Sequence, residues 1–190
     1  MIVLKLGGEL LEEASRLQVI VAAVAAMAGS APLAIVHGGG KEIDAALETA
    51  GIEKQQVDGL RITDDRTLDV VVSVLAGTVN TRLVAALTSA GVPAVGLTGA
   101  DAGCGLAEEA PPHETVDGRA VNLGRVGIPS DAADPRVVST LCSAGFVPVI
   151  ACIGLNRQGA LLNVNADTFA GHLAARLGAW ACSTPPASNG

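Results

Sequence analysis

The sequence has very few aromatic residues, with two Phe, one Trp and no Tyr among its 190 residues. Proteins that bind single-stranded nucleic acid use aromatic rings as stacking platforms, so this scarcity argues against that class. The core has to be built from Ala, Val, Leu and Ile, which suits helices packed on a parallel sheet. The lack of aromatic residues therefore favours an α/β fold.

Positive charge is also scarce. The chain has 12 Lys and Arg against 19 Asp and Glu, which leaves a formal net charge of −7. This charge disfavours nucleic acid and anionic membrane surfaces as partners. Only Lys5, Lys41 and Lys54 are lysines. Any anion site must therefore be local, and it must be built from loops and a few well-placed cations.

The sequence lacks the features of secretion and of membrane insertion. It opens with no signal-peptide layout, and its longest apolar run, within residues 17–28, is too short to span a bilayer. Four scattered cysteines have no Cys-x-x-Cys spacing, which favours reduced core residues over disulfides or metal ligands. These features predict a cytoplasmic protein whose own side chains bind no metal ion.

The chain does have a regular alternation of apolar runs and helical patterns. This alternation predicts an α/β fold, a three-layer αβα sandwich with a mostly parallel central sheet. We expect one domain over residues 1–182, and the Pro- and Ser-containing residues 183–190 are expected to form a disordered tail. Strands are expected at residues 1–6, 32–36, 93–97 and 147–153, and helices at residues 10–27, 41–50, 134–144 and 166–177, with a longer helix between an N-cap at Thr63 and Gly91.

Glycines follow the first two expected strands. Gly7 and Gly8 end the first strand, and residues 38–40 are three glycines between the second strand and the helix that begins at Lys41. The carboxyl ends of parallel strands are the edge of an α/β sheet where ligands bind. Glycine lets a ligand approach the backbone, and a helix start favours an anion. The loops are thus candidates for a phosphate or carboxylate site, with tight turns as the alternative.

Two cations stand out by their position. Lys5 lies within an apolar strand, where a charge is costly unless it has a partner or a function. It either forms a structural ion pair, for instance with Asp167, or neutralises a transferring phosphoryl group. Arg61 lies in a short extended segment, residues 57–62, and either grips a carboxylate with two hydrogen bonds or is a solvated surface residue.

Polar residues before the last helix form a further candidate site. Asn163, Asn165 and Asp167 alternate, so an extended backbone directs them to one side. They either bind a polar ligand and orient a lysine, or they cap the helix. His37 ends a strand beside the glycines, where holding the loop by hydrogen bonds is favoured over action as a general base.

Four of these segments occur in an informative order. They are residues 5–8 (Lys-Leu-Gly-Gly), 37–40 (His-Gly-Gly-Gly), 58–64 (Asp-Gly-Leu-Arg-Ile-Thr-Asp) and 163–167 (Asn-Val-Asn-Ala-Asp). In this order and spacing they resemble acetylglutamate kinases, which belong to the amino acid kinase family. Residues 75–80 (Leu-Ala-Gly-Thr-Val-Asn) also resemble the long-helix motif of that family. The resemblance covers about residues 1–179.

The resemblance implies phosphorylation of the γ-carboxylate of N-acetyl-L-glutamate in arginine biosynthesis, with ATP and Mg²⁺ as co-substrate. Such a reaction needs positioning and charge neutralisation rather than a protein nucleophile. The family also implies a homodimer. The implied roles are Lys5 for stabilising the phosphoryl group, Gly39 and Gly40 for N–H groups to substrate and phosphoryl, Gly7 and Gly8 for the phosphate side, Arg61 for the α-carboxylate, Asn163 for substrate contact and Asp167 for orienting the catalytic lysines.

Family members are longer than this chain. Their C-terminal half holds most of the ATP site and a second catalytic lysine, whose motif neither Lys41 nor Lys54 fits. We therefore expect a truncated kinase that consists of the acetylglutamate-binding lobe. Two alternatives stay open, namely a non-catalytic N-acetylglutamate-binding or dimerisation module and a kinase of a related acylated amino acid.

Overall fold

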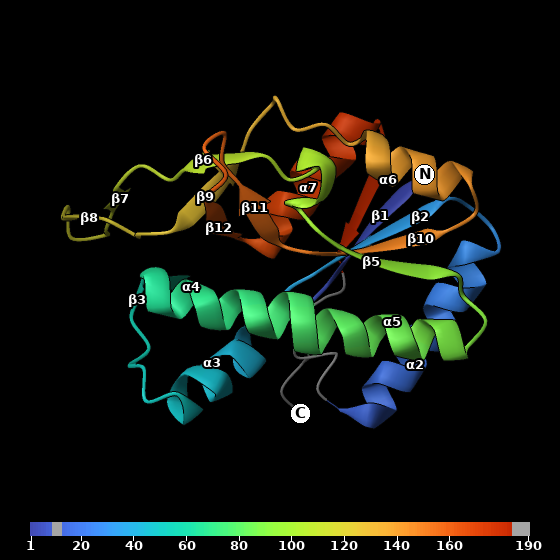
Figure 1. Cartoon of the computed structure of the whole chain (residues 1–190), viewed down its shortest axis with the longest axis horizontal. Helices are drawn as coiled ribbons and strands as arrows, with labels where there is room; N and C mark the ends of the chain where they lie inside the picture. The colour runs from blue at the N-terminus through green and yellow to red at the C-terminus, as the bar shows by residue number, and fades with distance from the viewer. Residues whose placement is uncertain (9–12, 184–190) are drawn as a thin grey trace.

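The computed structural model describes residues 1–8 and 13–183. A five-stranded sheet forms its centre, and each neighbouring pair of strands in this sheet is parallel (Figure 1). The predicted α/β class with a parallel central sheet is confirmed. From one edge to the other, the strands are β13 (Trp180–Ser183), β1 (Ile2–Leu6), β2 (Leu33–His37), β10 (Val147–Ala151) and β5 (Ala94–Thr98).

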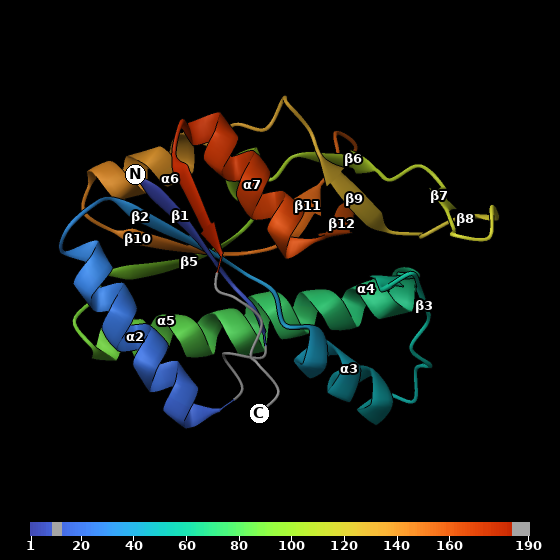
Figure 2. The same ribbon diagram turned by 180° about the vertical axis from the view of Figure 1, so that it is seen from behind.

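Helices cover both faces of the central sheet, which gives three layers (Figure 1, Figure 2). Of the six described α-helices, two pack on one face and four lie on the opposite side. The pair on the first face is α6 (Arg136–Ser143) and α7 (Ala166–Leu177), and the other side holds α2 (Ala14–Ala28), α3 (Gly40–Thr49), α4 (Asp65–Val72) and α5 (Asn80–Ser89).

A π-helical segment, η1 (Ser73–Val79), joins α4 and α5 into one continuous helix. The predicted N-cap Thr63 is wrong by one residue, because the Asp64 side chain accepts the cap hydrogen bond from the Thr67 N–H at 2.7 Å. Thr63 instead forms a parallel β-bridge with Gly124. Because Thr63 is paired in this bridge, the helix begins one residue later and Asp64 is its N-cap.

Among the described residues, the continuous helix Asp65–Ser89 is the one long and apolar enough to cross a membrane, by length and composition. It packs against the central sheet instead. Val71, Leu75, Leu83 and Leu87 on its inner face are buried. It is therefore read as a core helix of the domain, since buried helices of this kind pass the same test.

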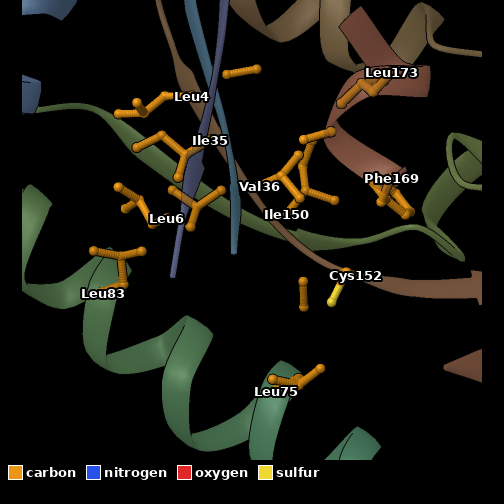
Figure 3. Packing of buried hydrophobic residues seen from close by; sticks show 14 of the residues in the cluster. Leu4, Leu6, Ile35, Val36, Leu75, Leu83, Ile150, Cys152, Phe169 and Leu173 are labelled. Carbon is orange, nitrogen blue, oxygen red and sulfur yellow. The ribbon is translucent and has the colours of Figure 1, made fainter. Parts of the chain in front are cut away.

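Successive residues of the central strands point to opposite faces of the sheet. Figure 3 shows Leu6 on the side of Leu83, and Val36 and Ile150 on the side of α7. The core is aliphatic, as the composition predicts. Of the aromatic residues, Phe169 is 3% exposed, whereas Phe146 and Trp180 are 41% and 81% exposed.

A second, mixed sheet lies beside the carboxyl edge of the central sheet (Figure 1). Its strand β6 comprises Ala107–Glu109. The other strands of this sheet are β9 (Val126–Pro129), β11 (Ile153–Leu155) and β12 (Leu161–Val164), and two small hairpins are formed by β3 (Gln56–Val57) with β4 (Leu60–Arg61) and by β7 (His113–Glu114) with β8 (Ala120–Val121).

The chain returns to the central sheet after α7. Strand β13 pairs in parallel with β1, from Ile2 opposite Trp180 to Lys5 opposite Ser183. Ser183, which the sequence assigns to a tail, is therefore a strand residue. Residues 184–190 of the predicted tail, like the predicted helix start at residues 10–12, lie outside the described residues.

The four cysteines are free thiols, as the sequence predicts. Cys104, Cys142 and Cys152 are buried, whereas Cys182 on β13 is exposed. Burial raises the pKa of the Cys152 thiol to about 12. This thiol is therefore neutral at physiological pH.

Candidate functional site

A cavity of about 310 Å³ opens at the carboxyl edge of the central sheet. All eight residues to which the family resemblance gives a role line this one cavity, and they come from four separate segments of the chain. They are Lys5, Gly7, Gly8, Gly39, Gly40, Arg61, Asn163 and Asp167. Ten further residues complete the lining: Gly38, Ile43, Gln56, Gly59, Leu60, Leu75, Val126, Cys152, Asn165 and Ala166.

A larger hollow of about 550 Å³ lies at the opposite edge of the sheet. It is lined by the ends of α2, α5 and α6 and by the strand starts that follow them. No Lys, Arg, Asp or Glu of the described residues lines it. Because it offers no charged group to a reacting molecule, the smaller cavity is the better candidate for chemistry.

The two glycine loops touch each other at the carboxyl ends of β1 and β2. A Cβ at Gly8 would lie 2.6 Å from the Cα of Gly39 and 3.0 Å from the N of Gly40. A Cβ at Gly39 would lie 2.9 Å from the Leu75 side chain. Any side chain at Gly8 would therefore force the loops apart. The glycines are required for this close approach of two backbones, and the approach brings both loops to one cavity.

Lys5 reaches the cavity because of the alternation along β1. Leu4 and Leu6 are buried on one face, so Lys5 points to the face that α7 covers. Its Nζ lies 3.0 Å from Oδ2 of Asp167, in the first turn of α7. The Asp167 side chain is 63% exposed, whereas that of Lys5 is 17% exposed. The expected Lys5–Asp167 contact is present, with one carboxylate edge in solvent.

Arg61 is held at the wall of the cavity by strand β4. Its side chain is only 10% exposed, and its Nη2 donates to the carboxylate of Asp44. The Nη1 atom is buried, and no group within residues 1–8 and 13–183 forms a hydrogen bond with it. A buried guanidinium nitrogen without a partner is costly, because it loses its bonds to water and gains none. The solvated-surface alternative is therefore wrong for Arg61.

Asp44 on α3 anchors this arginine. Its Oδ2 also accepts from Nζ of Lys54 at 2.7 Å. Burial by itself raises the pKa of Asp44, but the hydrogen bonds from Lys54 and Arg61 outweigh burial and leave the pKa below its usual value. Asp44 is therefore ionised at neutral pH, and it contributes stability that is lost only as the pH falls through this lowered pKa.

The three alternating residues near α7 have different partners. Nδ2 of Asn163 donates to Oγ1 of Thr63 at 3.2 Å, and the side chain of Asn165 caps α7 by accepting from the N–H groups of Asp167 and Thr168. The capping interpretation therefore holds for Asn165. Asn163 and Asp167 both line the cavity.

His37 is buried and does not line the cavity. Its Nδ1 lies 3.1 Å from the carbonyl oxygen of Gly38, and its Nε2 lies 3.0 Å from Nδ2 of Asn80. The predicted loop-holding contact is present. Burial lowers the pKa of His37 from 6.5 to about 4, against a smaller opposite effect of the Gly38 hydrogen bond. The imidazole is therefore neutral at pH 7.

This lowered pKa predicts a pH-dependent stability. Between pH 6.5 and 4 the unfolded chain binds a proton at His37 that the folded chain does not, so stability falls as the pH falls. We expect a loss of about 3 kcal/mol over this window, since one pKa unit corresponds to about 1.4 kcal/mol. Urea unfolding at pH 7, 6, 5 and 4.5 measures it. The same slope in the His37→Asn variant would contradict the assignment to His37.

The sequence reasoning assigned no contact at the site to two neighbouring residues, Asp44 and Asn80. Asp44 follows the glycine loop by one helical turn, but nothing local links it to Arg61. Asn80 follows the buried Val79 and is itself 5% exposed, so a polar residue within an apolar helical pattern was the available signal. The hairpin turn at Asp58 and Gly59, both with positive φ (46° and 78°), also has a signal, since Asp-Gly favours two-residue hairpin turns.

Comparison with known proteins shows the family of this chain. A model of the amino acid kinase family matches residues 1–183. Acetylglutamate kinase of Methanopyrus kandleri is 43% identical over 172 residues, which make up 90% of this chain and 65% of that protein. The chain spans between 49% and 65% of the length of the curated relatives reported with it, all acetylglutamate kinases.

Solved structures resemble the fold as well. The crystal structure of smu.665 from Streptococcus mutans UA159 has a TM-score of 0.77 and 26% identity, covering 93% of this chain and 68% of that one. N-acetylglutamate synthase from Neisseria gonorrhoeae, complexed with coenzyme A and N-acetyl-glutamate, has a TM-score of 0.75 and 25% identity, covering 94% of this chain and 39% of that one. Because a family model matches residues 1–183, which include every described residue, this chain belongs to the amino acid kinase family.

Proposed function

We propose that this chain is the acceptor-binding part of an acetylglutamate kinase and binds N-acetyl-L-glutamate in the carboxyl-edge cavity. The observation that carries the proposal is Arg61, which lines the cavity, has a side chain that is 10% exposed, and has a buried Nη1 without a hydrogen-bond partner among the described residues. A carboxylate supplies the missing acceptor, and arginine binds it with a fork of parallel hydrogen bonds. The names of the curated relatives support the same acceptor.

The charges of the cavity suit a molecule with two carboxylates. Arg61 enters from the β3–β4 hairpin, and Lys5 enters from the central sheet. The α-carboxylate binds Arg61, and the γ-carboxylate faces Lys5 and the glycine loops. Apolar residues Ile43, Leu60 and Leu75 line the same space and suit the methylene groups and the acetyl methyl group of the acceptor.

The transfer step needs no covalent intermediate with the protein. The γ-carboxylate oxygen attacks the terminal phosphorus of ATP, and the bond to ADP breaks. Lys5 neutralises the negative charge that accumulates on the phosphoryl oxygens, and Asp167 holds its ammonium group in place at 3.0 Å. The N–H groups of Gly39 and Gly40 donate to the reacting oxygens, and Asn163 contacts the acceptor.

Mg²⁺-bound ATP remains a proposal for the phosphoryl donor. Among the described residues, Lys5, Gly7 and Gly8 form the side of the cavity that suits a phosphate, because glycine leaves room for a close approach to the backbone. When bound, ATP supplies the phosphoryl group. The place in arginine biosynthesis, the cytoplasmic location and the homodimer likewise stay predictions from the family.

Calorimetry with N-acetyl-L-glutamate tests the proposal directly. We expect saturable binding to the purified chain and much weaker binding of glutamate, which lacks the acetyl group. N-acetylaspartate and N-acetyl-2-aminoadipate test the alternative of a related acylated amino acid. If none of these acids binds, the proposed function is wrong for this chain.

A non-catalytic binding module is the second candidate, since the chain spans only part of its relatives. An assay that couples ADP release to N-acetyl-L-glutamate and Mg²⁺-ATP separates the two functions. Turnover supports the kinase. Binding of N-acetyl-L-glutamate without turnover at high protein concentration supports the module.

Replacing Lys5 with Met should reduce turnover at least a hundredfold, because a developing phosphoryl charge loses its neutralising partner (about 3 kcal/mol). Affinity for N-acetyl-L-glutamate should change much less, since Arg61 carries the binding. The coupled assay and calorimetry measure the two effects. Lys54→Met is the matched control, because Lys54 lies outside the cavity lining. Equal losses in both variants would contradict the role of Lys5.

A further inference from the structure

A buried hydrogen-bonded pair lies beneath the glycine loop and takes no part in the proposed transfer step. His37 at the end of β2 is 0% exposed and Asn80 at the start of α5 is 5% exposed. Nδ2 of Asn80 lies 3.0 Å from Nε2 of His37 and 2.8 Å from the carbonyl oxygen of Val149 on β10. The pair therefore links the long helix to two central strands directly behind the cavity.

The contacts of Asn80 fix which nitrogen of His37 carries the proton. The carbonyl oxygen of Val149 only accepts, so the Asn80 atom facing it is the amide nitrogen. The same nitrogen donates its second hydrogen to Nε2 of His37, which is therefore unprotonated. In the neutral imidazole the proton then resides on Nδ1, which donates to the carbonyl oxygen of Gly38 at 3.1 Å.

This donation orients the peptide between Gly38 and Gly39. A trans peptide is planar, and its C=O and N–H point in opposite directions. With the Gly38 carbonyl directed to the buried His37, the N–H of Gly39 points the other way, toward the cavity that Gly39 lines. Within residues 1–8 and 13–183, this N–H donates to no backbone carbonyl.

The π-helical segment brings Asn80 to this position. In an α-helix, residues five apart point in directions that differ by about 140°. The i→i+5 bonding of a π-turn brings such residues much closer in direction. Leu75, whose side chain would lie 2.9 Å from a Cβ placed at Gly39, thus lies on nearly the same helix side as Asn80, five residues further on. The same side supports the loop by packing and by hydrogen bonding.

We propose that His37 and Asn80 are positioning residues that aim the Gly39 N–H at the acceptor carboxylate, with the imidazole held as the Nδ1–H tautomer. This inference rests on the proposed function for its ligand. It assigns the binding effect to a single hydrogen bond, from Nδ1 of His37 to Gly38. The contact between Nε2 and Asn80 selects the tautomer and stabilises the fold.

Two substitutions of His37 separate these contacts. In His37→Asn, the side-chain amide nitrogen takes the position of Nδ1 and retains the donor to Gly38. In His37→Gln, the side-chain oxygen takes the position of Nε2 and retains the acceptor for Asn80, but the donor to Gly38 is lost. We expect His37→Gln to weaken N-acetyl-L-glutamate binding at least tenfold in calorimetry, and His37→Asn to stay within threefold of the unsubstituted chain.

Thermal unfolding of both variants provides the control. A merely structural role of His37 predicts that affinity follows stability in both, and that result would overturn the proposal. Nitrogen-15 NMR of the ligand-free chain gives a reading without any substitution. Protonated Nδ1 and unprotonated Nε2 are expected at pH 7, and the opposite tautomer overturns the proposal even if both variants fail to fold.

The NMR measurement also distinguishes failure of the proposed function from failure of this inference. If the unsubstituted chain does not bind N-acetyl-L-glutamate, the proposed function is wrong. The orientation of the loop is then judged by the tautomer and by the Gly39 amide resonance. That resonance should keep its position in ligand-free His37→Asn and move in His37→Gln, and the reverse pattern would refute the positioning role.

Discussion

Replacing Arg61 with Ala is expected to lower the affinity for N-acetyl-L-glutamate about a hundredfold, which corresponds to about 3 kcal/mol for a charge-assisted pair of hydrogen bonds. The Arg61 side chain is 10% exposed, and its Nη1 has no hydrogen-bond partner in the described part of the chain, so a bound carboxylate gains bonds that water does not already supply. Calorimetry measures the loss. Arg61→Lys should recover only part of the affinity, since an ammonium group lacks the planar fork.

The control for this experiment is Lys54→Ala. Lys54 and Arg61 share the carboxylate of Asp44, but Lys54 is 40% exposed and lies outside the cavity lining. If Arg61 acts by contacting the ligand, Lys54→Ala leaves the affinity nearly unchanged. If both variants lose affinity to the same extent, Arg61 acts through Asp44 and the fold of the hairpin, and direct carboxylate binding is refuted.

Gly8→Ala is expected to abolish detectable turnover and N-acetyl-L-glutamate binding. The new Cβ would lie 2.6 Å from the Cα of Gly39, and backbone cannot move away as a flexible side chain does. The two loops must separate, which displaces the N–H groups of Gly39 and Gly40 from the ligand. Overpacking of this kind should also lower the free energy of unfolding by about 1–3 kcal/mol.

Gly77→Ala is the matched control for the loop substitution. A Cβ at Gly77 meets no atom within 4 Å, and the residue lies in the interior of the long helix. We expect this variant to bind normally and to gain about 0.5–1 kcal/mol of stability, since alanine favours a helix over glycine. Normal binding by Gly8→Ala would show that the contact between the loops is not needed for the site.

Much of the candidate site could be predicted from the sequence, because its residues follow strand ends. The glycines after β1 and β2 interrupt the local apolar pattern, and so does the lysine within β1. Such interruptions can be recognised from the sequence. A common sheet edge then brings them together in any parallel arrangement of these strands. The contact of Asp167 with Lys5 was expected from the opposite charges and from the family resemblance, whereas the 3.0 Å distance depends on the position of α7 on β1.

The contacts that hold the site in place could not be predicted from the sequence in this way. The sharing of Asp44 by Arg61 and Lys54 depends on how the β3–β4 hairpin folds back onto α3. The link from Asn80 to His37 depends on a π-turn, for which local propensity has no clear pattern. The displacement of the N-cap from Thr63 to Asp64 follows from a β-bridge to Gly124, far along the chain.

The sequence by itself determined the α/β class, the approximate helices and strands, and the residues that carry charge or lack a side chain at strand ends. These are properties of periodicity and residue type, which act over a few neighbouring positions. The tertiary structure alone decided which polar atoms are buried without a partner and which glycines touch another backbone. It also decided which ring nitrogen of His37 carries the proton. Such properties arise only when distant segments exclude water from one another, so no local pattern records them.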